Sequence, residues 1–126
     1  MLVTDGARLL LGHATRSPRW DIPKGVAEPD EALAVAAARE LEEETGLVAA
    51  PAALEALGVH RYLRDKDLAL FAWRPACLPD PATLSCRAVV TLPNGTRFPE
   101  LDRFTIASWD DALARVLAAV RARVAP

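Results

Sequence analysis

The stretch GVAEPDEALAVAAARELEEETGL, residues 25–47, decides the fold more than any other segment of this chain. Pro29 and Asp30 are typical of a helix start, and Gly46 is typical of a helix end. Between them, residues 31–45 are rich in alanine and leucine and contain neither glycine nor proline. The pattern therefore predicts a helix over residues 31–45.

Three glutamates share one face at the end of this predicted helix. At the helical spacing, Glu40, Glu43 and Glu44 fall within an arc of about 100°. Like charges so placed repel by roughly 0.2–0.5 kcal/mol per pair, and acids in the last turn oppose the helix dipole by about 0.3–1 kcal/mol each. An arrangement that costs helix stability indicates a functional site. Clustered carboxylates suit a hard cation such as Mg²⁺.

The helix alone leaves a second interpretation open. The acids can form a solvated face, with Glu43 paired to Arg39 one turn earlier. Leu33 and Ala36 lie further back on the acidic face, so we expect an apolar stripe that turns acidic. This stripe places the carboxylates at the edge of a packed region in either interpretation.

Size and composition bound the class of protein. The chain has 126 residues, of which 52% are hydrophobic, and this fits one compact domain. A net charge of -2 argues against broad binding of nucleic acid. We find no apolar run of the roughly 18 residues that a membrane span needs and no signal peptide, so we expect a cytoplasmic protein without a membrane partner. Cys77 and Cys86 are expected to be reduced thiols rather than a disulfide.

The rest of the chain predicts a mixed sheet covered by helices. Asp5-Gly6 favours a hairpin over residues 3–11. Strands are expected over 54–63 and 68–73, with 65–67 as their polar link, and a second hairpin over 87–98 around Pro93-Asn94-Gly95. Ser108 is a good N-cap for a closing helix that would run from 109 to about 124.

Residues 25–47 also match a known signature, G-x5-E-x7-R-E-U-x-E-E-x-G-U, where U is a bulky aliphatic residue. Every fixed position agrees, and a chance match is on the order of 10⁻⁹ per starting point at background frequencies. The chain thus resembles the Nudix hydrolase family. The resemblance implies one Nudix domain over 1–126, built as an α/β/α sandwich with a mixed β-sheet and a loop–helix–loop catalytic box at 25–47.

The resemblance implies roles for the residues of the box. Glu40, Glu43 and Glu44 match the glutamates that hold Mg²⁺ or Mn²⁺, and the last two are also candidates for catalysis. Gly25 matches the glycine whose carbonyl joins these ligands. Arg39 matches the arginine that orients the glutamates.

Outside the metal ligands, the resemblance leaves several roles open. Glu31 matches a box position, but an acid at a helix N-terminus explains it equally well. Many family members add a glutamate from a later loop as general base or extra ligand. Residues 98–104 resemble that segment, which makes Glu100 the candidate and Asp102 the fallback.

Residues 20–25, W-D-I-P-K-G, are similar to a W-x-x-P-K-G segment of dinucleoside polyphosphate and diphosphoinositol polyphosphate hydrolases. Trp20 and Lys24 are therefore candidates for substrate binding, although Lys24 is equally well explained as a solvated loop lysine. Tyr62, Phe71 and Trp73 can stack on a base, or belong to the core as strand aromatics usually do. His13 carries no motif.

The activity that the resemblance implies is metal-dependent hydrolysis of a diphosphate linkage in a nucleotide-like small molecule. Dinucleoside polyphosphates are the first expectation, and mutator-type hydrolysis of nucleoside triphosphates is the alternative. A third alternative is a nucleotide-sensing module without catalysis, but such modules usually lose the box glutamates that this chain retains. A homodimer is compatible with the sequence.

Overall fold

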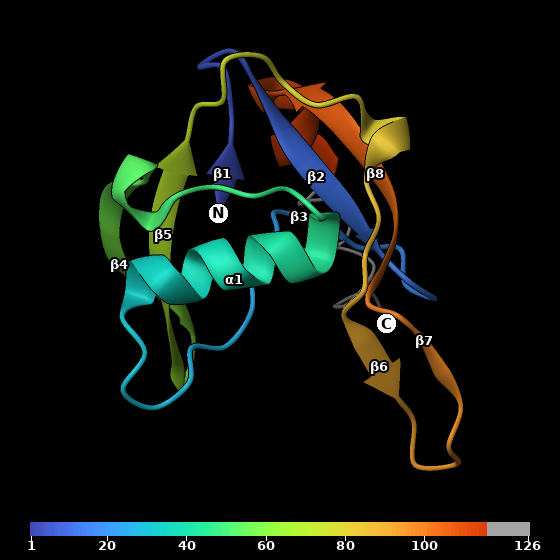
Figure 1. Ribbon diagram of the computed structural model, residues 1–126. Coiled ribbons are helices and arrows are strands. Elements are labelled where there is room, and N and C mark those ends of the chain that lie inside the picture. The colour runs from blue at the N-terminus through green and yellow to red at the C-terminus, as the bar shows by residue number, and fades with distance from the viewer. Residues whose placement is uncertain (116–126) are drawn as a thin grey trace.

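A computed structural model of the chain describes residues 1–115, apart from the side chains of residues 62 and 63. Its regular elements, shown in Figure 1, follow in chain order. They are β1 (Leu2–Val3), β2 (Arg8–Ala14), β3 (Trp20–Asp21), α1 (Leu33–Thr45), the 3-10 turn η1 (Pro51–Ala53), β4 (Glu55–Leu63), β5 (Lys66–Trp73), the 3-10 turn η2 (Pro81–Thr83), β6 (Val89–Thr91), β7 (Arg97–Pro99) and β8 (Leu101–Ser108). A helical segment follows over residues 109–115.

The strands form two three-stranded sheets, ordered β1-β5-β4 and β3-β2-β8, and a separate hairpin of β6 and β7. β1 runs parallel to β5, whereas β2 is antiparallel to both of its neighbours and β4 is antiparallel to β5. Helix α1 lies across the region between the two sheets in Figure 1. The strands are thus mixed in direction and packed against helices, which confirms the predicted α/β fold class.

Strand β2 forms the middle layer because both of its faces are covered. Leu10 belongs to a core with Leu41 of α1 and Phe71 of β5. Leu9 and Leu11 point the other way, into a second core that includes Ala112 of the helical segment 109–115. A strand covered on both faces needs a nearly continuous apolar run, and Leu9-Leu10-Leu11 supplies it. Phe71 is only 8% exposed, in agreement with its expected core role.

Helix α1 begins two residues later than predicted and ends where predicted. Its N-cap is Ala32, whose side chain makes no capping bond, and Asp30 lies outside the helix with φ of 65°. Gly46 caps the other end with φ of 82°, and its N–H donates to Glu42 O at 2.8 Å. The expected apolar stripe is wrong at Leu33, which is 49% exposed, and correct at Ala36, which is buried.

The first predicted hairpin is also wrong in part. Asp5-Gly6 does make a turn, but only one isolated bridge, Thr4↔Leu9, joins its two arms. β1 instead pairs in parallel with Ala72 and Trp73 of β5. The arms therefore belong to different sheets, because long-range pairing outweighs the local turn preference.

The other predicted turns and the predicted cap hold with small shifts. The β4–β5 turn lies at residues 64–65 rather than 65–67. β6 and β7 form the second predicted hairpin. Ser108 Oγ accepts the N–H of Asp111 at 3.2 Å, as an N-cap does, while the predicted helix end at 124 lies outside the described residues.

Cys77 and Cys86 are free thiols. No helix within residues 1–115 has the length and apolar character that would cross a membrane.

Strand β8 is missing from the sequence prediction, which treated residues 98–104 as a loop. It pairs along the whole of β2, from Arg8↔Ser108 to Ala14↔Leu101. The charged start of the segment, at Asp102 and Arg103, hid the strand signal of Phe104-Thr105-Ile106 that follows. β8 matters for the site because Glu100 directly precedes it.

Candidate active site

Arg39 organises the acidic end of α1. Its Nε and Nη2 atoms donate to the two carboxylate oxygens of Glu31, both at 2.8 Å. Its Nη1 atom donates to Glu40 at 2.8 Å and lies 3.4 Å from Glu43 Oε2. Paired guanidinium and carboxylate groups fix each other's orientation. Hydrogen bonds from Arg39 and from the backbone of Glu28 also lower the pKa of Glu31 to about 2.

The structure shows which groups the Glu31 carboxylate contacts, a question that the sequence left open. Its carboxylate accepts the N–H of Glu28 at 3.0 Å as well as the bonds from Arg39. Glu31 thus ties the loop before α1 to the arginine that holds Glu40. Glu31 lies directly before the N-cap Ala32 and not in the first helical turn, because the helix begins only at Leu33.

Gly25 lies against the carboxylate of Glu40. A Cβ atom built on Gly25 would be only 2.0 Å from Glu40 Cδ, far inside van der Waals contact. A larger residue at position 25 would therefore push aside the Glu40 carboxylate, which is the far end of a flexible side chain. Glycine at position 25 thus leaves room for the Glu40 carboxylate where Arg39 holds it, independently of the ligand role expected for the glycine carbonyl.

Glu44 is the most buried acid of the group. It is 4% exposed, and Lys24 N–H donates weakly to its Oε2 atom at 3.4 Å. Burial raises the pKa of Glu44 to about 8, and the negative charges of Glu100 and Glu40 add to this effect. A buried carboxylate with too few partners is a place where a bound cation would be stabilising.

Glu100 reaches the same region from a different element. It is half-buried, its N–H donates to Ala88 O at 2.9 Å, and its carbonyl accepts the N–H of Thr15 at 3.1 Å. Burial raises its pKa, and so do the charges of Glu40 and Glu43. The structure therefore brings Glu100 and the box glutamates into one electrostatically coupled group.

The donor set fits a hard divalent cation in its chemistry. The coupled carboxylates offer oxygen atoms, the ligands that Mg²⁺ and Mn²⁺ prefer. Their geometry is not that of a closed metal site, since no three His, Cys, Asp or Glu side chains within the described residues are gathered tightly enough to hold an ion. Glu40 and Glu43 turn toward Arg39 instead.

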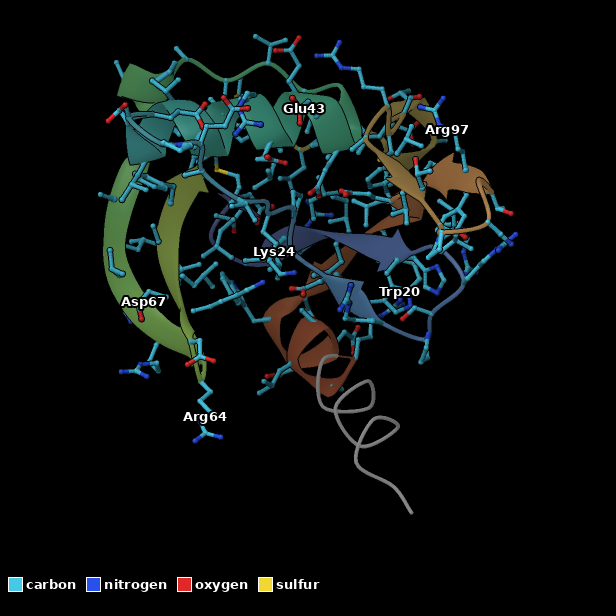
Figure 2. All side chains as sticks on the ribbon, turned by 90° about the horizontal axis from the view of Figure 1, so that it is seen from below. Trp20, Lys24, Glu43, Arg64, Asp67 and Arg97 are labelled. Atoms are coloured by element: carbon cyan, nitrogen blue, oxygen red, sulfur yellow. The ribbon has the colours of Figure 1, made fainter. Side chains whose placement is uncertain are left out.

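Of the candidate substrate residues, Lys24 lies beside the acidic group, where its N–H reaches Glu44. Figure 2 shows Glu43 on α1, with Lys24 and Trp20 on the side of the β3-β2-β8 sheet. Lys24 Nζ forms an ion pair with Asp21 at 3.2 Å. Tyr62 lies on β4, but its side chain is outside the described part of the structure.

Trp20 forms part of an open groove of about 670 Å³. The guanidinium of Arg115 lies 4.7 Å from the centre of a Trp20 ring, and that of Arg103 lies 5.6 Å away. The start of β8 and the turn η2 complete the lining. The groove combines an aromatic ring with two arginines and with the carboxylates of Asp80 and Asp102, a combination that the sequence did not indicate.

Sequence reasoning also missed a pair formed by His13 and Asp102. His13 is 7% exposed, and its Nδ1 atom lies 2.6 Å from Asp102 Oδ1. The hydrogen bond from His13 lowers the pKa of Asp102. Asp102, the fallback for Glu100, is thus engaged by histidine rather than grouped with the glutamates. The pairing depends on the register of β2 and β8, which no local motif encodes.

Comparison with known proteins identifies the family. The NUDIX domain family matches residues 1–118 of the chain. An uncharacterized 17.7 kDa protein of Enterobacteria phage T4, from its e-segB intergenic region, is 35% identical over 116 residues, which cover 84% of this chain and 77% of that protein. The chain therefore belongs to the Nudix family and is a Nudix hydrolase by class.

Solved structures agree on the fold. A Caenorhabditis elegans Ap4A hydrolase, crystallised as a binary complex, has a TM-score of 0.58 at 22% identity, over 86% of this chain and 74% of its own. The Nudix domain of Shewanella oneidensis NrtR, complexed with ADP-ribose, has a TM-score of 0.61 at 15% identity, over 97% and 82%. At such identities the likeness concerns the arrangement of helices and strands alone.

Proposed function

We propose that this protein hydrolyses a diphosphate linkage in a nucleoside polyphosphate, with dinucleoside polyphosphates as the favoured substrates and Mg²⁺ or Mn²⁺ as the cofactor. The observation that carries the proposal is that Arg39 holds Glu40 and Glu43 at the end of α1 that also carries the buried Glu44, with Glu100 near enough to raise the pKa of Glu44. A cluster of mutually repelling carboxylates is unfavourable in a structural face. It is suited to a site that neutralises phosphate charge.

Glu40, Glu43 and Glu44 would hold the divalent cation, together with the carbonyl oxygen of Gly25. When bound, the cation supplies positive charge for the phosphate oxygens and lowers the pKa of water. The protein's own residues do the remaining work. Arg39 keeps the carboxylates of Glu40 and Glu43 at the same end of α1, and both would turn from Arg39 toward the cation when it binds.

Glu100 is the proposed general base. Its raised pKa brings the carboxylate closer to neutral pH, where a base combines ionisation with useful basicity. It accepts the proton of the attacking water on a carboxylate oxygen. A box glutamate is the alternative base, and comparison of Glu100→Gln with Glu43→Gln decides between them.

Lys24 and Trp20 are the proposed substrate contacts. Lys24 lies close to the carboxylate of Glu44 through its backbone, and its ammonium group is held by Asp21, where it can attract a phosphate. The groove beside Trp20 has room for a nucleoside, and it offers Arg103 and Arg115 as hydrogen-bond donors and Asp80 and Asp102 as acceptors. A substrate with phosphates between two nucleosides would use both the acidic site and this groove.

The experiment is a phosphate-release assay with Mg²⁺ or Mn²⁺ over a panel of dinucleoside polyphosphates, nucleoside triphosphates and ADP-ribose. We expect turnover of at least one dinucleoside polyphosphate and none after chelation of the metal. Release from triphosphates alone would support the mutator-type alternative. Nucleotide binding without any hydrolysis would support a sensing module and contradict the proposal.

A matched pair of helix variants tests the site assignment. Glu43→Gln should retain the fold and lose several orders of magnitude in turnover. Glu42→Gln is the control, because Glu42 is 44% exposed in its side chain and faces Arg87 at 3.5 Å rather than the acidic group. Near-normal turnover of the Glu43 variant would overturn the metal-site assignment.

A further inference from the structure

His13 is a buried histidine that the proposed chemistry leaves without a task. It lies near the end of β2, and its Nδ1 atom is bonded to Asp102 across the strand pair at 2.6 Å. Its ring also meets Trp20 edge-on, with 5.1 Å between ring centres. One buried side chain therefore connects a wall of the groove to the strand that follows Glu100.

A β-bulge brings Asp102 to the histidine. In the register of β2 and β8, His13 pairs with Arg103 and the next residue, Ala14, pairs with Leu101. Asp102 is the extra residue between these pairs. Side chains alternate along a regular strand, so the side chain of residue 102 would otherwise point away from the face that His13 occupies. A bulge redirects a side chain, and here the redirected group is the acceptor for His13.

Thr15, which directly follows β2, forms hydrogen bonds to the backbone of Glu100 and of the residue before it. Thr15 N–H donates to Glu100 O at 3.1 Å, and Thr15 Oγ donates to Pro99 O at 2.5 Å. His13 and Thr15 thus form hydrogen bonds to Pro99, Glu100 and Asp102. The one side-chain bond to β8 among these three is that of His13.

We propose that His13 is a positioning residue that, through its hydrogen bond to the bulged Asp102, fixes Glu100 opposite the box helix. This inference rests on the proposed role of Glu100. Helix α1 carries its glutamates rigidly, whereas Glu100 stands between the β6–β7 hairpin and an irregular stretch of β8. Removal of the His13 bond releases the bulge, and Glu100 loses its fixed distance from the carboxylates of α1.

The first test compares two substitutions at His13 that differ in one donor. Asparagine can present an N–H group near the position of Nδ1, whereas leucine fills similar space without any donor. His13→Leu should lower kcat about 10- to 100-fold, as expected for a displaced catalytic group, with little change in KM. His13→Asn should recover most of that loss. Equal kcat losses in both variants would overturn the proposal.

The second test asks whether His13 acts through Glu100. In a double-mutant cycle, His13→Leu should add almost nothing to the kcat loss of Glu100→Gln, because the group to be positioned is already disabled. Additive losses would show that His13 acts elsewhere and would contradict the proposal. His60→Leu is the matched control, since His60 is exposed on β4 and its variant should keep normal kcat.

The third test does not depend on turnover and separates the two proposals. Amide hydrogen exchange at Thr15 should be faster in His13→Leu than in His13→Asn, because the Thr15 N–H bond to Glu100 O is lost as the bulge loosens. Unchanged exchange would overturn the positioning role. If exchange accelerates while Glu100→Gln keeps full activity, then His13 does fix the backbone at Glu100, and the assignment of Glu100 as the base fails instead.

Discussion

Helix α1 and the segment around Glu100 both contribute carboxylates to the candidate site, but different interactions place these carboxylates. The carboxylates of α1 are placed by a contiguous motif, in which Arg39 and Gly25 also have fixed positions. Glu100 is placed by strand pairing over a long separation, through the end of β2 and the bulge at Asp102. The helix half of the site is therefore encoded locally, and the strand half depends on tertiary structure.

The largest expected effect tests the helix half. Glu44→Gln should lower kcat about 1000-fold, because it removes the buried carboxylate that we propose as a metal ligand. Its amide occupies the same volume, so far-UV circular dichroism should be unchanged. Steady-state kinetics at saturating Mg²⁺ measure the effect. A loss smaller than that of Glu100→Gln, expected to be about 100-fold, would reverse the ranking of the two halves.

Gly25→Ala should be the next largest effect. The added methyl group would displace the carboxylate of Glu40, so the apparent affinity for Mn²⁺ should fall about 10- to 100-fold. The stability should change little, because the displaced atoms are the far end of a flexible side chain. Isothermal titration calorimetry and chemical denaturation measure these two quantities. Val26→Ala is the neighbouring control, since Val26 is 77% exposed, and an equal loss there would refute the steric explanation.

The pH dependence of stability sharpens the comparison in metal-free protein. Burial raises the pKa of Glu44 from 4.5 to about 8, so the folded state binds a proton more tightly than the unfolded state. Stability should therefore decline as the pH rises from about 4.5 to about 8. In EDTA, we expect Tm to fall over this range, and Glu44→Gln to flatten the fall. An unchanged slope in the variant would contradict this origin.

The smallest effect concerns the two thiols. Cys77 is exposed, whereas burial raises the pKa of Cys86, with smaller contributions from Glu44 and Glu100. Iodoacetamide should therefore modify Cys77 well before Cys86 at pH 8, because the thiolate is the reacting form. Peptide mass spectrometry at timed intervals gives both rates. Faster labelling of Cys86 would show that its segment opens more readily than the structure indicates.

The sequence predicted most of what local interactions determine. The end of α1 at Gly46, the β6–β7 hairpin and the cap at Ser108 follow from residues close in the chain. The acidic face of α1 followed from helical spacing alone. The family signature then predicted which carboxylates belong to the site.

Features that depend on distant pairing could not be predicted in the same way. β1 pairs with β5 rather than with the other arm of the predicted hairpin. The strand pattern of β8 was not recognised because charged residues stand at its start. The bond of His13 to Asp102 spans 89 positions and requires a bulge in one register. A shift of one residue would turn each side chain to the opposite face, and local sequence does not fix that choice.

The β6–β7 hairpin, which extends away from the body of the molecule in Figure 1, is a suitable place to attach a spectroscopic label. Its tip is open, since a Cβ atom on Gly95 would meet no atom within 4 Å. Its base ends at Glu100, which bonds to Ala88 at the start of the hairpin. A fluorophore attached at position 94 in a Cys77→Ser background would therefore sit clear of the site and still report on the segment that carries Glu100.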